Sequence, residues 1–295
     1  MIIPVQWNRF YWFFYFYGCV MSDLNPLGTL ISTAEFASCC SGEDSAEITH
    51  AHLDSITEAV RHRYGALAKT AVERALSSDK ASDTFYTEEQ RHALTDETVG
   101  ASAGCGNPVG IADAKPGETV LDLGSGGGID CFLAAREVGE TGHVIGIDMT
   151  PEMLTLAREN ADKLLTENIV FKLGHIESIP QADNSVDLVI SNCVIALSEK
   201  KSRVFSEIFR ILKPGGRFVI SDVVTEKPLP MDVRKSAAEW VDCVGGAAVM
   251  SEYIEMIAEA GFVDVDVLEK RTRSSGDEAW RDLLINLTIR AFKKV

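Results

Sequence analysis

The stretch VLDLGSGGG, residues 120–128, decides the fold of this chain. Its apolar residues predict a short buried strand, and four glycines then crowd a turn before a helix predicted over residues 129–138. Glycines gather in such a turn because a residue without a Cβ lets backbone N–H groups come close to a ligand at a helix N-terminus. The stretch therefore predicts a strand, turn and helix built around a bound ligand.

Two aspartates narrow the kind of ligand. The next predicted strand, 143–147, leads into Asp148, where a carboxylate is placed to bind the hydroxyls of a ribose. Asp122 stands two residues before the first glycine, where its charge would repel a pyrophosphate but pair with a cation such as an ammonium or sulfonium. The glycine order also departs from G-x-G-x-x-G, which disfavours an NAD dehydrogenase. We expect a cofactor that carries a nucleoside and a cationic group.

Strands and helices alternate on both sides of this unit. Strands are predicted at 119–123, 143–148, 169–173, 186–190 and 218–224, and helices at 129–138, 151–165 and 200–212. Such alternation with short connections predicts a mostly parallel, doubly wound α/β sheet that binds its ligand at the carboxyl ends of the strands. The form strand–Asp–Leu–Gly–x–Gly–x–Gly resembles motif I of the class I S-adenosylmethionine-dependent methyltransferases. That resemblance implies a Rossmann-like sheet of seven strands, with an N-terminal helical cap and a helical insertion before the last two strands.

The chain divides into three predicted parts. Residues 1–54 are expected to be a mobile lead or a spurious extension, residues 55–115 the helical cap, and residues 116–295 the S-adenosylmethionine-binding domain with a substrate insertion at about 228–250. The aromatic run within residues 1–20 is too short to span a bilayer, so we favour an upstream extension with Met21 opening the functional chain. A membrane-anchoring stub is the alternative. The net charge of −16 disfavours nucleic acid or an anionic membrane as partner and favours a small molecule.

The predicted strand ends supply the cofactor-binding residues. Ile176 and Glu177 follow the third strand, where an apolar side chain and a carboxylate can flank an adenine, and Asn192 ends the fourth strand. Together with the motif I resemblance, these positions give the predicted S-adenosylmethionine site: Asp122, Gly124, Ser125, Gly126, Gly128, Asp148, Met149, Ile176, Glu177 and Asn192.

Seven cysteines are scattered over the chain without a C-x-x-C pair. This pattern is typical neither of a secreted disulfide framework nor of a structural zinc site, and predicts reduced thiols in a cytoplasmic protein. Cys131, on the helix after the glycine turn, is expected to be a small core residue.

Four segments make the resemblance more specific. GCGNP (104–108), SNCVIALS (191–198), RILKPGGRFVISDV (210–223) and WVDCVGGA (240–247) resemble signature segments of the arsenite methyltransferases. In that family three thiolates hold trivalent arsenic, which implies Cys105, Cys193 and Cys243 as the catalytic, arsenic-binding residues here. The resemblance further implies arsenite or its thiol conjugates as substrate and thioredoxin or glutathione as reductant. We expect the protein to be a monomer.

The chemistry is consistent with that resemblance. Trivalent arsenic is soft, and thiolates are the ligands that select soft metals and metalloids. Three sulfurs leave its lone pair free to attack a methyl carbon, so no general base is needed. A methyltransferase for an organic small molecule and a non-catalytic arsenite-binding protein are the alternatives.

The sequence departs from the family near its N-terminus. The family commonly has a further cysteine shortly after the Tyr-Gly of its first helix, and no thiol follows Tyr64 and Gly65 there. The pair Cys39 and Cys40 lies upstream instead, where it either delivers arsenic and exchanges disulfides with Cys105 or has no role.

Overall fold

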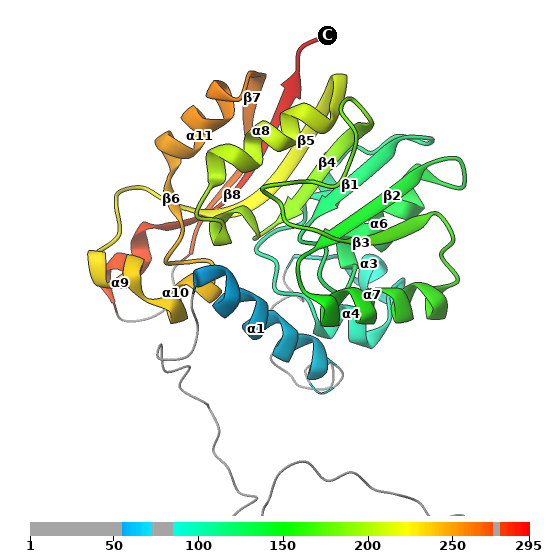
Figure 1. The fold of residues 1–295 in the computed structure, drawn as a ribbon, viewed down its shortest axis with the longest axis horizontal. Coiled ribbons are helices and arrows are strands. Elements are labelled where there is room, and N and C mark those ends of the chain that lie inside the picture. The colour runs from blue at the N-terminus through cyan, green and yellow to red at the C-terminus, as the bar shows by residue number, and fades with distance from the viewer. Residues whose placement is uncertain (1–54, 72, 74–84, 274–277) are drawn as a thin grey trace, which may run out of the picture. The chain divides into compact units, whose positions relative to one another are not determined.

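The computed structural model describes residues 55–71, 73, 85–273 and 278–295 (Figure 1). The predictions for residues 1–54, including Cys39 and Cys40, lie outside this range.

A single sheet runs through the domain in the order β3-β2-β1-β4-β5-β8-β7. Its strands are β1 Thr119–Leu123, β2 His143–Asp148, β3 Ile169–Leu173, β4 Val186–Asn192, β5 Leu212–Thr225, β7 Phe262–Thr272 and β8 Leu284–Lys293. The first five strands pair in parallel, whereas β8 pairs antiparallel with β5 and β7 antiparallel with β8. The predicted mostly parallel, doubly wound fold is confirmed.

The sheet differs from the prediction at two points. Within the described residues it has eight strands rather than seven, because the two-residue strand β6, Ala248–Val249, pairs with the end of β5. Strand β5 also begins earlier than the strand predicted at 218–224, since residues 212–217 belong to it. They form an irregularity in which the pairing shifts from Val186↔Leu212 to Leu188↔Arg217. The Pro-Gly-Gly sequence there resembles a turn but serves as a bulge.

Helices cover both faces of the sheet (Figure 1). They are α6 Ile129–Val138, α7 Pro151–Leu164, α8 Lys201–Ile211 and α11 Met250–Glu259. A hydrophobic core lies on each face of the sheet, and neighbouring strand residues point alternately into one or the other. Val120 packs with residues of α6, whereas Leu121 packs with residues of α8 and α11. Burial on both faces explains why the central strands are nearly continuous runs of apolar residues.

The other helical elements do not belong to this layer of covering helices. They are α1 Ile56–Lys69, α3 Glu88–His92, α4 Asp96–Gly100, α5 Val109–Ala112, the 3-10 turn η4 Ile195–Leu197, α9 Met231–Lys235, α10 Ala237–Val241 and η5 Ala279–Leu283. Helix α1 begins at Ser55, whose hydroxyl accepts from the Glu58 N–H at 3.2 Å, and it packs against α7 and α10 (Figure 1). This arrangement brings α1 and α10 to the edge where the parallel strands end.

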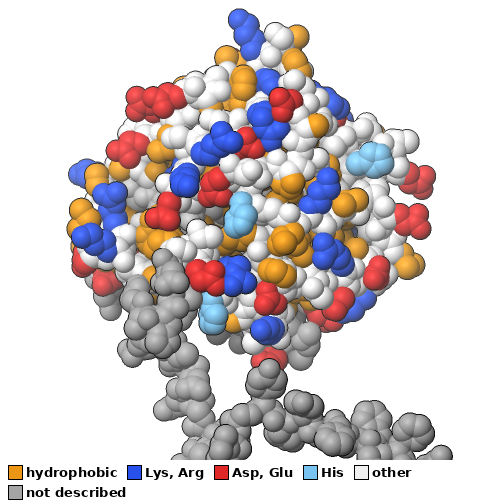
Figure 2. Space-filling view, in the orientation of Figure 1, with side chains coloured by type: hydrophobic (Ala, Val, Ile, Leu, Met, Phe, Trp, Pro, Cys, Tyr) orange, Lys and Arg blue, Asp and Glu red, His pale blue; other side chains and the backbone are white. Residues whose placement is uncertain are grey.

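The surface shown in Figure 2 carries basic and acidic side chains interspersed with one another. Among the described residues, no helix is long and apolar enough to cross a membrane.

Candidate active site

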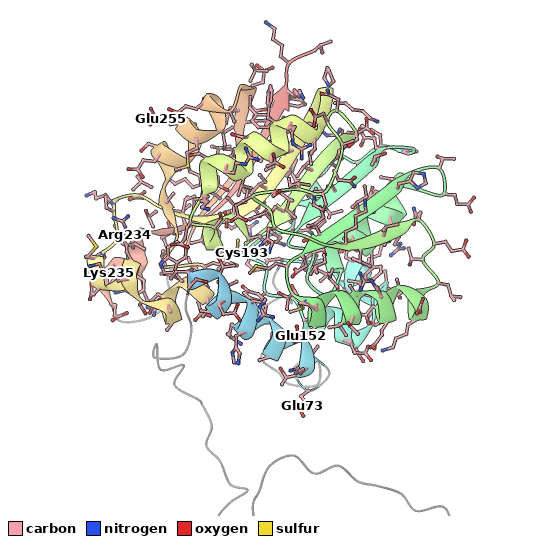
Figure 3. The ribbon with its side chains drawn as sticks, in the orientation of Figure 1. Glu73, Glu152, Cys193, Arg234, Lys235 and Glu255 are labelled. Carbon is pink, nitrogen blue, oxygen red and sulfur yellow. The ribbon has the colours of Figure 1, made fainter. Side chains whose placement is uncertain are left out.

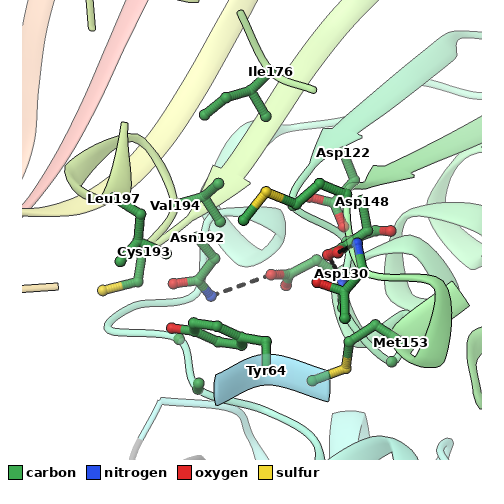
Figure 4. A pocket seen from close by; sticks show the side chains of 18 of the residues that line it. Tyr64, Asp122, Asp130, Asp148, Met153, Ile176, Asn192, Cys193, Val194 and Leu197 are labelled. Atoms are coloured by element: carbon green, nitrogen blue, oxygen red, sulfur yellow. Dashed lines mark hydrogen bonds between the residues drawn. The ribbon is translucent and has the colours of Figure 1, made fainter. Parts of the chain in front are cut away.

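A pocket opens at the carboxyl edge of the sheet, above β1, β2 and β4 (Figure 4). Its empty volume, including solvent at the mouth, is about 1020 Å³. Nine of the ten predicted cofactor-binding residues line it: Asp122, Gly124, Ser125, Gly126, Asp148, Met149, Ile176, Glu177 and Asn192. Gly128 does not line the pocket. It begins α6 with φ +95°, and a Cβ there would meet the Phe132 ring at 2.7 Å, so its requirement for glycine is structural.

Asp148 holds the glycine turn in place. Its carboxylate accepts from the Gly126 N–H at 2.9 Å and from the Thr150 N–H at 2.8 Å. Gly124 has φ +68°, and a Cβ at this position would collide with the Val194 side chain. Burial raises the pKa of Asp148, while the backbone N–H groups oppose that rise. The turn is thus fixed before any ligand enters.

The pocket also contains an unsatisfied polar atom. The Ser125 hydroxyl is buried and has no hydrogen-bond partner among the described residues. A buried hydroxyl without a partner is costly, and a ligand group in this pocket would satisfy it. The glycine cradle, the Asp148 carboxylate and this free hydroxyl fit the nucleoside and amino-acid parts of S-adenosylmethionine.

Carboxylates surround the turn on its inner side. Asp122 is buried at 2% exposure and accepts from the Cys131 thiol at 3.3 Å. Burial and the neighbouring charge of Asp130 raise the pKa of Asp122 well above its usual range. Cys131 is a fully buried core residue, as predicted, and its thiol also donates a hydrogen bond to the Asp122 carboxylate, which the sequence did not predict.

Farther along the pocket, Glu177 accepts a close hydrogen bond from the Ser198 hydroxyl. Ile176 lies on the opposite side of the pocket from Tyr64, a residue of α1 (Figure 4). Tyr64 was not predicted to line the pocket, because a tyrosine within an amphipathic helix has the same sequence pattern as a packing residue.

Asn192 has a role that the sequence did not reveal. Its side-chain oxygen accepts from the backbone N–H groups of Cys105 and Gly106, at 2.9 and 3.2 Å. Its amide nitrogen donates to the Gly106 carbonyl at 2.8 Å, the Tyr86 hydroxyl at 3.0 Å and Asp130 Oδ2 at 3.1 Å. Its hydrogen-bonding capacity is therefore largely used in holding the Cys105 loop, although it lines the cofactor pocket.

The two glycines beside Cys105 have a packing reason. A Cβ on Gly104 would meet the Asn192 amide at 2.5 Å, and a Cβ on Gly106 would meet the Ser221 hydroxyl at 2.5 Å. Only glycine lets this loop lie so close to the ends of β4 and β5. The sequence G-C-G thus presents a thiol at the end of the sheet.

The three predicted arsenic ligands lie in one buried cluster. Cys105, Cys193 and Cys243 are free thiols, 7%, 5% and 3% exposed. The Cys243 thiol donates to the Cys193 carbonyl at 3.1 Å, and Cys193 also lines the cofactor pocket. Figure 3 shows Cys193 above α1, at the edge of the sheet.

Backbone geometry sets two of these thiols apart from ordinary core cysteines. Cys193 has φ +61° and Cys243 has φ +63°, in the left-handed region that a residue with a Cβ seldom occupies. Such strained residues cluster at functional sites. The Cys193 N–H donates to the Ser221 carbonyl at 2.7 Å, which fixes the turn at the end of β4.

The surroundings of the three thiols raise the pKa of each. Interaction with the Cys105 thiol raises the pKa of Cys193, and interaction with Cys193 in turn raises the pKa of Cys243; burial adds to both. Interaction with Cys193 lowers the pKa of Cys105, but burial and the charge of Asp222 outweigh that effect. Among the described residues no three side chains of His, Cys, Asp or Glu converge as they would around a metal ion. The three thiols would therefore have to move closer together to bind one atom jointly.

Residues 114–261 match the methyltransferase domain family, which defines the class of protein to which this fold and glycine turn belong. An arsenite methyltransferase of Halobacterium salinarum is 41% identical over 275 residues, covering 86% of this chain and 70% of that protein. An arsenite methyltransferase of Aquipseudomonas alcaligenes is 34% identical, covering 80% of this chain and 72% of that protein.

A solved structure is also similar to this chain. The arsenic(III) S-adenosylmethionine methyltransferase from Chlamydomonas reinhardtii superposes with a TM-score of 0.60 at 36% identity, covering 76% of this chain and 74% of that one. The chain belongs to the arsenite methyltransferase family.

Proposed function

We propose that this chain transfers a methyl group from S-adenosylmethionine to trivalent arsenic held by Cys105, Cys193 and Cys243, and so contributes to arsenic detoxification. The observation that carries the proposal is that three free thiols belong to one buried cluster and that one of them, Cys193, lines the glycine-cradled pocket. Thiolates select soft metalloids, and these thiols come from three segments far apart in the sequence.

The pocket supplies the binding groups for S-adenosylmethionine, which brings a methyl group on a cationic sulfur. In this proposal Asp148 binds the ribose hydroxyls, the N–H groups and hydroxyl of the glycine turn bind polar groups of the amino-acid part, and Ile176 with Glu177 flank the adenine. The support is that these side chains line a single pocket and that the Ser125 hydroxyl within it has no partner in the part of the chain that the structure describes.

The protein contributes position rather than proton transfer. Arsenic bound by three sulfurs has a lone pair and no proton to remove, so a general base is unnecessary. Cys193 lines the pocket itself, which lets arsenic approach the donor within the ~3–3.5 Å of a near-attack arrangement. Burial of all three thiols excludes water from the reacting atoms.

We further propose that the substrate is arsenite or its thiol conjugate, and that thioredoxin or glutathione serves as reductant. A monomer in the reducing cytoplasm would suit these roles. The support is that each cysteine in the described part of the chain is a free thiol.

The test is to incubate the protein with arsenite, S-adenosylmethionine and a thiol and to identify the arsenic species formed. We expect methylated arsenic from the wild type and almost none from Cys193→Ser or Cys243→Ser. Cys131→Ser is the matched control, because a serine hydroxyl keeps the hydrogen bond to Asp122. Full activity of the Cys193 and Cys243 variants, or turnover that does not depend on arsenite, would contradict the proposal.

A further inference from the structure

A buried carboxylate that lines the cofactor pocket is hydrogen-bonded to the side chain that holds the Cys105 loop. Asp130 lies in the first turn of α6 and is 3% exposed. Its Oδ2 accepts from the Asn192 amide nitrogen at 3.1 Å (Figure 4). Its Oδ1 accepts from the Tyr86 hydroxyl at 3.0 Å, and that hydroxyl in turn accepts from the same amide nitrogen at 3.0 Å. The three side chains therefore form a closed hydrogen-bonded triangle.

Two members of this triangle are fixed by the hydrophobic core. Asp130 lies between Ile129 and Cys131, which are buried in the same hydrophobic cluster as Tyr86. The Tyr86 side chain is itself only 4% exposed. A carboxylate in the first turn of a helix is also favoured by the helix dipole. Asp130 and Tyr86 thus give the Asn192 amide, at the end of β4, two fixed partners.

The orientation of the Asn192 amide decides whether the Cys105 loop is held. Its oxygen accepts from the N–H groups of Cys105 and Gly106, whereas its nitrogen donates to the Gly106 carbonyl. If the amide turned over, its hydrogens would face two backbone N–H groups and its oxygen would face a carboxylate and a carbonyl. Because a carboxylate oxygen accepts from the amide nitrogen and repels the amide oxygen, Asp130 favours the orientation that holds the loop.

We propose that Asp130 is a positioning residue for the arsenic ligand Cys105, because it orients the Asn192 amide that holds the Cys105 loop. This rests on the proposed function, in which Cys105 binds arsenic. Asp130 takes no part in the bonds that form and break during methyl transfer. Its effect reaches arsenic through Asn192 and the loop.

A different role for Asp130 would be to attract the cationic group of the donor by its charge, and two variants separate these roles. Asp130→Ala removes both the charge and the acceptor for Asn192, whereas Asp130→Asn removes the charge but keeps an oxygen that can accept from Asn192. In the absence of S-adenosylmethionine, Asp130→Ala should weaken arsenite binding about tenfold, the size of one lost hydrogen bond to a charged group. Asp130→Asn should weaken it less than about threefold, because the hydrogen bond is kept in neutral form.

A double variant tests whether Asp130 acts through Asn192. Asn192→Ala alone should weaken arsenite binding about 100-fold. Adding Asp130→Ala to that variant should weaken binding no further, since there is no amide left to orient. Independent contributions would instead multiply to about 1000-fold, as they do for residues that share no partners.

A second readout does not depend on arsenite. When the thiols of the ligand-free protein are labelled and each cysteine is followed by mass spectrometry, Cys105 should react about tenfold faster in Asp130→Ala, because the released loop exposes it. Cys131, which is 0% exposed, should stay protected and so report that the fold is intact. Glu207→Gln is the matched control for a general loss of stability, because Glu207 is also a buried, hydrogen-bonded carboxylate but does not line the pocket. Cys105 should react in that control as it does in the wild type.

Equal arsenite affinities in wild type and Asp130→Ala would overturn the inference. So would equal losses in Asp130→Ala and Asp130→Asn, which indicate a role of charge, or a multiplied loss in the double variant. Labelling of Cys131 together with Cys105 in Asp130→Ala would also overturn it, because Asp130 would then stabilise the fold as a whole. Failure of the wild type itself to bind arsenite through its thiols would instead contradict the proposed function.

Discussion

Replacement of Asn192 by alanine tests how the Cys105 loop is held. The side chain makes three hydrogen bonds to that loop, with the N–H groups of Cys105 and Gly106 and the carbonyl of Gly106. At a net ~1 kcal/mol for each neutral hydrogen bond, their loss removes about 3 kcal/mol from the ordered loop. Since 1.4 kcal/mol corresponds to tenfold, ligands that need the loop in place should bind about 100-fold more weakly.

We therefore expect Asn192→Ala to weaken arsenite binding about 100-fold and S-adenosylmethionine binding much less. Arsenite binding is measured by protection of the thiols from labelling, and cofactor binding by calorimetry. Asn168→Ala is the matched control, because Asn168 also donates to backbone carbonyls, at Ala135 and Gly139, but away from the pocket. A loss of cofactor affinity with unchanged arsenite binding would refute the reasoning. It would indicate instead that Asn192 binds the cofactor, as the sequence predicted.

Three further predictions concern the cofactor turn and the core. Asp148→Ala should weaken S-adenosylmethionine binding at least tenfold while arsenite binding is kept, as calorimetry and thiol protection would show; equal loss of both would contradict it. Gly128→Ala should destabilise the fold by about 2–3 kcal/mol in urea unfolding, because φ is +95° and the Cβ meets a phenyl ring; an unchanged midpoint would contradict it. The hydrogen bond from Arg210 lowers the pKa of the Glu207 carboxyl, which is 4% exposed. The ionised carboxylate therefore stabilises the fold fully at a pH above 4.5, the usual pKa of a glutamate, and this contribution is lost as the pH falls through the lowered pKa. Glu207→Gln should accordingly cost about 3 kcal/mol at pH 7 and progressively less in acid, and a difference that does not depend on pH would exclude this ion pair as its source.

The architecture could be predicted from the sequence because its signals are local. Apolar strand runs, the glycine turn and the alternation of elements each require only neighbouring residues. The bulge at residues 213–216 could not be predicted, since Pro-Gly-Gly is equally typical of a turn, and its pairing with β4 is a tertiary property. The same applies to β6, whose two residues form a strand only because β5 lies beside them.

The pocket residues that directly follow a strand could be predicted from the sequence. Asp148 and Ile176 are examples, because parallel strands end at a common edge. The position of Tyr64 in the pocket was not predictable, since a tyrosine in a helix comes to line a pocket only through the elements packed around that helix. Asn192 was placed correctly in the pocket, but its hydrogen bonds to a loop about 86 residues earlier in the chain are visible only in the fold.

The central claim is that three sulfurs hold the arsenic atom. X-ray absorption at the arsenic edge of arsenite-loaded protein tests it most directly, because the spectrum reports the number and type of bound atoms. The account predicts three sulfur ligands in the wild type, and two sulfurs with one oxygen in Cys105→Ser, Cys193→Ser or Cys243→Ser. An arsenic atom that keeps its oxygen ligands in the wild type, or three sulfurs that persist in all three variants, would contradict it.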